Sequence, residues 1–484
     1  MTLSAFLANR LGPPASSAAR RISRLRADMR SSVAEGAFSQ IFLNIAGPGS
    51  VFVTSLAFLL GATDATMGYI FAAGPILQGA QVLGPLVLPA FGGSRRRTVL
   101  TSGALGRALM LAAPCAALFF PAPVALATLV ACFLLSQVFA GVASNVMTSW
   151  LGALVPRPIR GRFLGRRMQP AIVAGFVVAF AASVLKDLAG PGSSAGLAGF
   201  LRRTFHLTNG LWGADGARYA FVIIFAVAGL FGVAAILPVR AITDRRAANR
   251  FRFADFAEPF RDRAFRPLLV LFGCWFFAVY FGSPFWQPFF LKELGLSLTT
   301  IMLYSLISTV AMVATARVWG RLIDRYGNRP VFRGLILLAV ANAFVYVFMT
   351  REHYWWIWLE AATSGAMWGG AGVATMNFLL RFAPEEKRDA YVAAFAVVTG
   401  GCGLASSLLS GYVVGLLPPR IYVAGMPFVN MKFAFAATAW LRLMVQFPMY
   451  RVREPRAAAF RHMMREVADD ARLRLLNWLP RSWK

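Results

Sequence analysis

Long hydrophobic runs alternate with short polar segments along most of the 484-residue chain. A helix of about 20 apolar residues is needed to cross the ~30 Å hydrocarbon core of a bilayer. Twelve runs approach or exceed this length, and we expect each to form a membrane-spanning helix. These runs cover residues 37–60, 66–91, 98–120, 123–155, 170–185, 218–239, 267–290, 298–319, 331–350, 355–382, 390–416 and 429–449. The pattern predicts an all-α polytopic membrane protein.

Composition and charge agree with this prediction. Hydrophobic residues make up 58% of the chain and charged residues 14%, whereas soluble proteins average about 25% charged residues. The formal net charge is +29, and most Lys and Arg residues lie in alternate loops and in both termini. Positive loops stay on the cytoplasmic side, so we expect both termini in the cytoplasm and the protein in a bacterial inner membrane. Topology and anionic lipids therefore explain the charge better than a nucleic-acid site does.

The charged segments divide the chain into five parts. A basic, uncleaved N-terminus is followed by six spans, a basic central loop, six further spans and a basic tail. The apolar residues of the tail recur at helical spacing, which predicts an amphipathic helix on the inner leaflet or against the base of the protein. A partner-binding helix is the alternative. The boundaries are 1–36, 37–239, 240–266, 267–449 and 450–484.

The connection between the eighth and ninth spans fixes the orientation of the rest. Residues Gly320–Arg333 read G-R-L-I-D-R-Y-G-N-R-P-V-F-R, with a single acid, Asp324, among four arginines. Two glycines permit a sharp turn, so we expect a tight loop. Because the loop is short and strongly basic, we place it on the cytoplasmic face.

The two halves repeat one another. Pro156 and Arg160 follow the fourth span with the same spacing as Pro384 and Arg388 after the tenth. Gly84 and Arg97 have the same separation as the two ends of the Gly320–Arg333 loop. Six spans, a long inner loop and six more spans indicate pseudo-symmetric halves related by an axis along the membrane normal.

With these features the sequence resembles the major facilitator superfamily over nearly all of 30–450. The loop matches the family signature G-x-x-x-D-R-x-G-x-R, whereas the first half has Leu88 where the signature has its acid. The resemblance implies alternating access, with the loop helping to hold an inner gate closed. It also implies that Asp324 stabilises one conformation of the cycle. The candidate gate residues are Gly320, Arg321, Asp324, Arg325, Gly327, Arg329 and Arg381.

We expect Asp324 to pair with Arg381 at the inner end of the tenth span. The alternative is an acid that is solvated among the loop arginines. Glu360 is the acid that the predicted boundaries place inside a span, away from the inner surface. A charge in the hydrocarbon costs about 2.5–3.5 kcal/mol on insertion scales, which favours a partner or a watery cavity. Glu360 is thus a substrate or proton site, or else a carboxylate near the outer interface.

Polar stripes on the first, fourth, seventh and tenth spans are the candidate substrate contacts. The resemblance implies that these helices line the central cavity, although some of the polar groups can simply bridge helices. Arg107 and Arg442 lie inside the third and twelfth spans, where each can bind an anionic substrate or extend to the inner surface. The candidate cavity residues are Gln40, Asn44, Gln137, Asn145, Tyr280, Gln287, Glu360, Ser364 and Trp368.

The sequence therefore favours a secondary active transporter for a small organic solute, expected as a monomer. The four cysteines and three histidines have no metal or redox spacing, so we expect no metal, no cofactor and no catalytic residues. No Walker loop is present, which disfavours ATP as the direct energy source. Protons coupled through Glu360 are a further hypothesis. A membrane scaffold or sensor that transports nothing is the alternative function.

Overall fold

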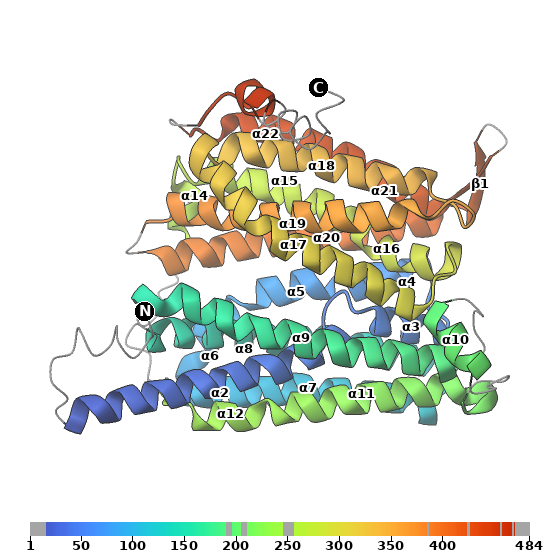
Figure 1. Ribbon diagram of the computed structural model, residues 1–484, viewed down its shortest axis with the longest axis horizontal. Helices are drawn as coiled ribbons and strands as arrows, with labels where there is room; N and C mark the ends of the chain where they lie inside the picture. Colours follow the sequence, from blue (N-terminus) through green and yellow to red (C-terminus); the bar gives the residue numbers. More distant parts are fainter. Residues whose placement is uncertain are drawn as a thin grey trace, which may run out of the picture. The chain divides into compact units, whose positions relative to one another are not determined.

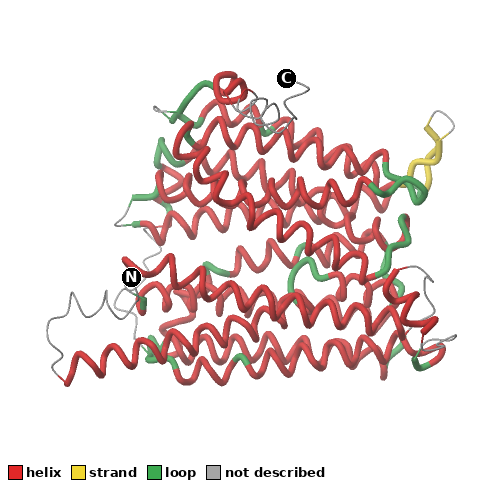
Figure 2. The backbone as a smooth tube through the Cα atoms, in the orientation of Figure 1, coloured by secondary structure: helices red, strands yellow, loops and turns green. Residues whose placement is uncertain are grey.

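The computed structural model describes residues 16–155, 157–189, 196–204, 211–244, 256–384, 387–423, 426–454, 457–466 and 469. Nearly all of this backbone is helical (Figure 2). The exception is a two-stranded antiparallel hairpin, β1 (Arg420–Val423) with β2 (Met426–Val429), in which Arg420 lies opposite Val429. Much of the central loop, Pro156 and the end of the tail lie outside the described residues.

The chain divides into two compact units. Unit 1 comprises residues 1–252 and 296–302, and unit 2 comprises 253–295 and 303–484. Within unit 1 the long helices α2, α7, α8, α9 and α11 lie side by side (Figure 1). The helices of unit 1 are α2 (Ser16–Ala46), α3 (Val51–Leu59), α4 (Asp64–Phe71), α5 (Ala73–Ala80), α6 (Leu83–Val87), η1 (Leu88–Phe91), α7 (Arg95–Phe119), α8 (Ala122–Leu154), α9 (Arg157–Ala189), α10 (Gly196–Thr204), η2 (Gly213–Asp215), α11 (Gly216–Ala234) and α12 (Ile236–Ala241).

In unit 2, α15 packs on α20, and α18 packs on both α19 and α21. The core between them is aromatic: the ring of Phe272 lies 5.4 Å from that of Phe332 and 5.1 Å from that of Phe395. The helices are α14 (Glu258–Arg261), α15 (Arg266–Gly282), η3 (Ser283–Phe285), α16 (Trp286–Pro288), η4 (Phe289–Glu293), α17 (Leu298–Tyr326), α18 (Asn328–Phe348), α19 (Trp356–Phe382), α20 (Arg388–Leu416), α21 (Asn430–Met444) and α22 (Gln446–Arg451).

The helices fit the expected membrane-spanning pattern. Within the described residues, nine helices are long and apolar enough to cross a bilayer, or ten if the pair Thr66–Ala80 and Leu83–Phe91, bent by 58°, forms one span. Helix α19 and the pair α21–α22 occupy the positions expected for the tenth and twelfth spans. The prediction of an all-α membrane protein is confirmed, and the helix order is consistent with twelve spans.

The first helix begins earlier than the hydrophobic pattern predicts. We expect the first span from residue 37, but α2 is continuous from Ser16 to Ala46. The apolar run marks only the C-terminal part of this helix. The N-terminal part of α2 carries polar residues, and one side of it packs against the bundle. As a result, Asp28, Ser32 and Glu35 are buried helix residues.

The connection between α17 and α18 is much shorter than expected. Instead of a loop over Gly320–Arg333, α17 stays helical to Tyr326 and α18 begins at Asn328. Gly327 alone makes the turn, with a φ of 93° that side chains rarely tolerate. Gly320 lies within the helix, where a methyl group would meet open space. The backbone conformation therefore requires glycine at position 327 but not at position 320.

We predict opposite effects of alanine at these two glycines. Gly327→Ala forces a strained φ and places a Cβ 3.0 Å from Ala457, which should destabilise the fold by about 1–3 kcal/mol. Gly320→Ala removes backbone freedom in a helix and should stabilise it by about 0.5–1 kcal/mol. Thermal unfolding of the purified protein measures both. Equal melting temperatures for the two variants would contradict the assigned turn.

Candidate functional site

The turn between α17 and α18, which contains the predicted gate residues, is held by a buried acid, Glu454. Its side chain, 1% exposed, accepts hydrogen bonds from the backbone N–H groups of Arg329 at 2.8 Å and Asn328 at 3.2 Å. The guanidinium of Arg381 forms an ion pair with the same carboxylate. Because the first N–H groups of a helix lack internal partners and carry partial positive charge, a carboxylate stabilises the start of α18.

The expected pairing of Asp324 with Arg381 is therefore wrong in this structure. Asp324 is exposed, and no hydrogen bond or ion pair joins it to the described part of the chain. The backbone N–H groups at the start of α18 are bonded to Glu454 instead. The alternative of a solvated acid among arginines describes Asp324 better. Arg381, which we expected to pair with Asp324, pairs with Glu454 instead.

Unit 1 has the same arrangement with different residues. Asp244 accepts hydrogen bonds from the hydroxyl of Ser94 at 2.5 Å and from the backbone N–H of Arg96 at 3.2 Å, and so caps α7. Each acid follows the last helix of its unit, and each lies six residues after a proline, Pro238 in one unit and Pro448 in the other. This repeated spacing is the sequence signal that could have identified both acids.

The tail adds a second contact, at the end of α17. Glu466 accepts hydrogen bonds from the hydroxyl of Tyr326 at 2.5 Å and from Arg325 at 2.8 Å. The Tyr326 bond, together with the charges of Arg325 and His462, lowers the pKa of Glu466. A lowered pKa means that the contact is complete above the ordinary carboxyl pKa and is lost as the pH falls through the lowered one. The described tail residues 457–466 thus lie against the base of unit 2.

Glu360 is the centre of a buried polar cluster in unit 2. The carboxylate, in a residue that is 5% exposed, accepts hydrogen bonds from the hydroxyls of Tyr304 at 2.7 Å and Tyr346 at 2.5 Å. Arg442 is also buried, donates to the carbonyl of Ala339 at 2.8 Å, and lies within electrostatic range of Glu360. Here unit 2 thus buries an acid and an arginine, Glu360 and Arg442, without a direct ion pair between them among the described residues.

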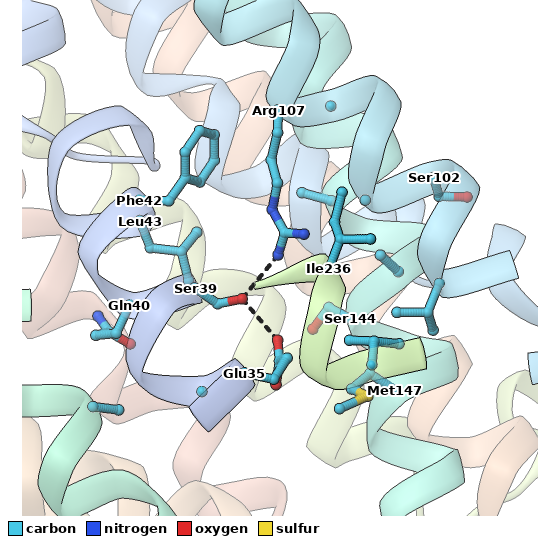
Figure 3. A pocket seen from close by; sticks show the side chains of 18 of the residues that line it. Glu35, Ser39, Gln40, Phe42, Leu43, Ser102, Arg107, Ser144, Met147 and Ile236 are labelled. Atoms are coloured by element: carbon cyan, nitrogen blue, oxygen red, sulfur yellow. Dashed lines mark hydrogen bonds between the residues drawn. The ribbon is translucent and has the colours of Figure 1, made fainter. Parts of the chain in front are cut away.

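Unit 1 contains a cavity of about 400 Å³ lined by α2, α7, α8, α9 and α12. The Arg107 side chain of α7 reaches into it and donates to the hydroxyl of Ser39 at 2.8 Å (Figure 3). Ser39 in turn donates to Glu35 at 2.7 Å (Figure 3). The other oxygen of Glu35 pairs with Arg167 of α9 at 2.5 Å. A hydrogen-bonded chain thus crosses the wall of the cavity.

Two of the predicted cavity residues in unit 1 line this space and two do not. Gln40 and Gln137 face it. Asn44 accepts a hydrogen bond from Gln40 at 2.8 Å but is not part of the lining. Asn145 packs against the backbone of Gly84 in α6, which is the helix-bridging role that we left open for such groups.

The remaining predictions fall in unit 2. Ser364 is buried and next to Glu360. Tyr280 and Gln287 are half-buried, and the ring of Trp368 lies 6.2 Å from that of buried Trp275. Of these residues, Ser364 lies next to Glu360 on α19, as their spacing of four residues predicts.

Sequence reasoning missed Glu35 and Arg167. Glu35 falls in the segment 1–36 that the hydrophobic pattern assigns to a cytoplasmic terminus, and Arg167 in a basic connection. The buried side of α2 is visible only once α9 packs on it. Within the described residues, no group of His, Cys, Asp and Glu side chains is arranged to hold a metal ion.

Comparisons with known proteins agree with the helical membrane fold. A family model described as the Major Facilitator Superfamily matches residues 37–407. A putative metabolite transport protein of Haemophilus influenzae is 39% identical over 72 residues, which is 15% of this chain. The chain thus matches only 18% of the length of that curated relative.

Solved structures show a similar architecture. The nucleoside transporter NupG is 14% identical, with a TM-score of 0.62 over 88% of this chain and 99% of the other. A D-xylose-proton symporter is 15% identical, with a TM-score of 0.61 over 89% and 98%. A bacterial homologue of the human lysosomal transporter Spinster is 14% identical, with a TM-score of 0.57 over 90% and 97%. At these identities the likeness shows the fold alone.

We predict that Glu454→Gln destabilises unit 2 while Asp324→Asn does not. In the glutamine side chain an NH₂ group replaces one carboxylate oxygen. The start of α18 therefore loses an acceptor, and Arg381 loses the negative charge with which it pairs. Loss of a buried acceptor costs about 1–3 kcal/mol. Asp324 is exposed, so its amide should leave the melting temperature unchanged. Thermal unfolding compares the two, and a larger loss in Asp324→Asn would reverse the assignment.

Proposed function

We propose that this chain, which belongs to the major facilitator superfamily, is a secondary active transporter that moves a small organic solute across the bacterial inner membrane by alternating access. Membership of this family makes it a multi-pass membrane transporter rather than an enzyme. The observation that carries the proposal is the cavity of about 400 Å³ in unit 1. Its volume and its mixture of apolar walls with few polar groups are typical of small-molecule sites.

The capped helices supply the rigid bodies that such a cycle needs. In each unit an acid after the last helix holds the start of the third span, α7 or α18. We infer that this contact keeps each unit intact while the two rock, and that the turn at Gly327 belongs to the gate. The proposed gate residues stay those of the signature, with Glu454 added as the acid that engages Arg381.

We propose Glu360 as a proton-coupling residue. Two tyrosine hydroxyls donate to one of its oxygens, and Arg442 is buried in the same unit. Protonation would remove the negative charge that Arg442 balances and weaken the hydrogen bonds of the two hydroxyls. A single proton can thus change the packing of α17, α18 and α21, which is the kind of coupling that a symport or antiport cycle requires.

A scaffold or sensor that transports nothing was the alternative function. The cavity favours transport, because a scaffold has no need of a chamber with polar groups in its wall. Truncation before residue 455 separates the two functions. Solute flux that survives loss of the tail in proteoliposomes, even where partner assembly is lost, supports transport. Absence of flux from the full-length protein with every solute in a broad panel supports the scaffold.

We predict that Glu360→Gln abolishes accumulation driven by a pH gradient but spares passive exchange. The amide keeps the shape of the side chain and cannot bind or release a proton. Uptake and counterflow in proteoliposomes, with radiolabelled organic solutes, measure the two activities. Glu352→Gln is the matched control, because Glu352 is an exposed acid in the preceding connection. Driven accumulation by Glu360→Gln at the level of this control would exclude proton coupling at Glu360.

A further inference from the structure

The cavity of unit 1 carries one positive charge in excess. Its lining includes two arginines, Arg107 and Arg167, and a single acid, Glu35. Glu35 is occupied directly by Arg167, at 2.5 Å, and Arg167 is further held by the carbonyl of Ser32 at 3.1 Å. Arg107 reaches Glu35 only through the hydroxyl of Ser39. Among the described residues of the lining, no carboxylate forms an ion pair with Arg107 directly.

The cluster in unit 2 shows what compensation looks like in the same chain. There one buried acid, Glu360, accompanies one buried arginine, Arg442, whereas in the cavity Arg107 and Arg167 share the single acid Glu35. A charge that is removed from water costs several kcal/mol unless it is paired. The guanidinium of Arg107 carries more N–H donors than its bond to Ser39 uses. An anion in the cavity would supply the missing charge and accept from the free donors.

A second group in the cavity also lacks a partner. The side chain of Gln137, which is 2% exposed, donates to the hydroxyl of Ser136 at 2.9 Å and to the carbonyl of Phe133 at 3.4 Å. A carbonyl can only accept, so this bond fixes which end of the amide is the NH₂ group. Its carbonyl oxygen is buried and has no hydrogen bond within the described structure. It therefore calls for a donor.

The rest of the wall is largely apolar. Apolar side chains from α2, α8 and α12, such as Phe42, Met147 and Ile236, lie around the polar groups (Figure 3), and α9 adds further apolar residues to the lining. Apolar walls lower the local dielectric, which strengthens a charge-assisted hydrogen bond. They also favour a ligand with an apolar body rather than a fully hydroxylated one. The apolar lining residues include Phe42, Leu43, Met147, Met168, Ile172 and Ile236.

From these observations we propose that the unit 1 cavity binds a small organic anion. Its carboxylate engages Arg107, an O–H or N–H group donates to the carbonyl oxygen of Gln137, and its apolar body lies against the aliphatic wall. Glu35 is a positioning residue, which holds Ser39 and Arg167 and limits the positive charge of the site. The proposal names the substrate class of the transporter proposed above. That such an anion is transported rests on the proposed function, whereas its binding in the cavity does not.

The test is direct binding to the purified full-length protein in detergent, measured by calorimetry. The probes are small carboxylates, each with its neutral amide, led by 4-hydroxyphenylacetate and 4-hydroxyphenylacetamide, with phenylacetate as the analogue that lacks the hydroxyl donor. Charge-assisted hydrogen bonds are the stronger kind, so the acid should bind at least about tenfold more tightly than its amide. Phenylacetate should bind severalfold more weakly than the hydroxylated acid.

Variants separate this site from a general effect of charge. Arg107→Gln should lose about tenfold or more in affinity for the acid and none for the amide, which shows that the cavity is still formed. Arg107→Lys should recover part of the loss. Glu35→Gln should tighten binding of the acid, since it removes the competing negative charge. Arg218→Gln, at an exposed ion pair with Asp215, is the matched control and should bind like the parent protein.

The outcomes distinguish the two proposals. The anion site is overturned if no carboxylate of the panel binds, if acid and amide bind equally, or if Arg107→Gln binds the acid like the parent protein. Transport of a neutral solute without carboxylate binding would overturn the anion site and leave the transporter intact. Carboxylate binding without flux in proteoliposomes would support the site and count against transport.

Discussion

A polar or charged group inside a bundle of apolar helices must find its partner within the bundle, because lipid offers none. This constraint organises each unit. Glu454 and Asp244 occupy the open N-termini of α18 and α7, and Glu360 is surrounded by tyrosine hydroxyls and Arg442. At Arg107 the compensation is incomplete, and there the structure has a cavity rather than a packed core.

The two capping acids, Asp244 and Glu454, occupy equivalent positions in the repeated halves and link helices within each unit. A hydrogen bond from the start of α7 or α18 to the acid after the sixth span joins the third and sixth spans of one unit. In unit 2 the tail reinforces the contact, since Glu466 engages Arg325 and Tyr326 and the backbone N–H of Ala458 donates to the carbonyl of Tyr326 at 2.8 Å. The turn between α17 and α18 thereby contacts segments that are distant in the sequence.

The sequence was sufficient for features that depend on local pattern. Apolar runs gave the helices, and the signature around Asp324 gave the family, which the family match confirms. The partner of Arg381 could not be read in this way, because the choice between Asp324 and Glu454 depends on where α17 ends and which way its side chains point. Glu35 was missed for a related reason: its burial arises from packing of α2 on α9, which leaves no periodic apolar signal.

Alternating access requires the two units to exchange between conformations around a solute. Spin labels at the first turns of α7 and α18, one in each unit, report this exchange as a distance distribution by double electron–electron resonance in proteoliposomes. The account predicts two populations whose ratio changes when a transported solute is added, and changes again when it is removed. A single distribution that stays the same while the solute is bound would contradict alternating access.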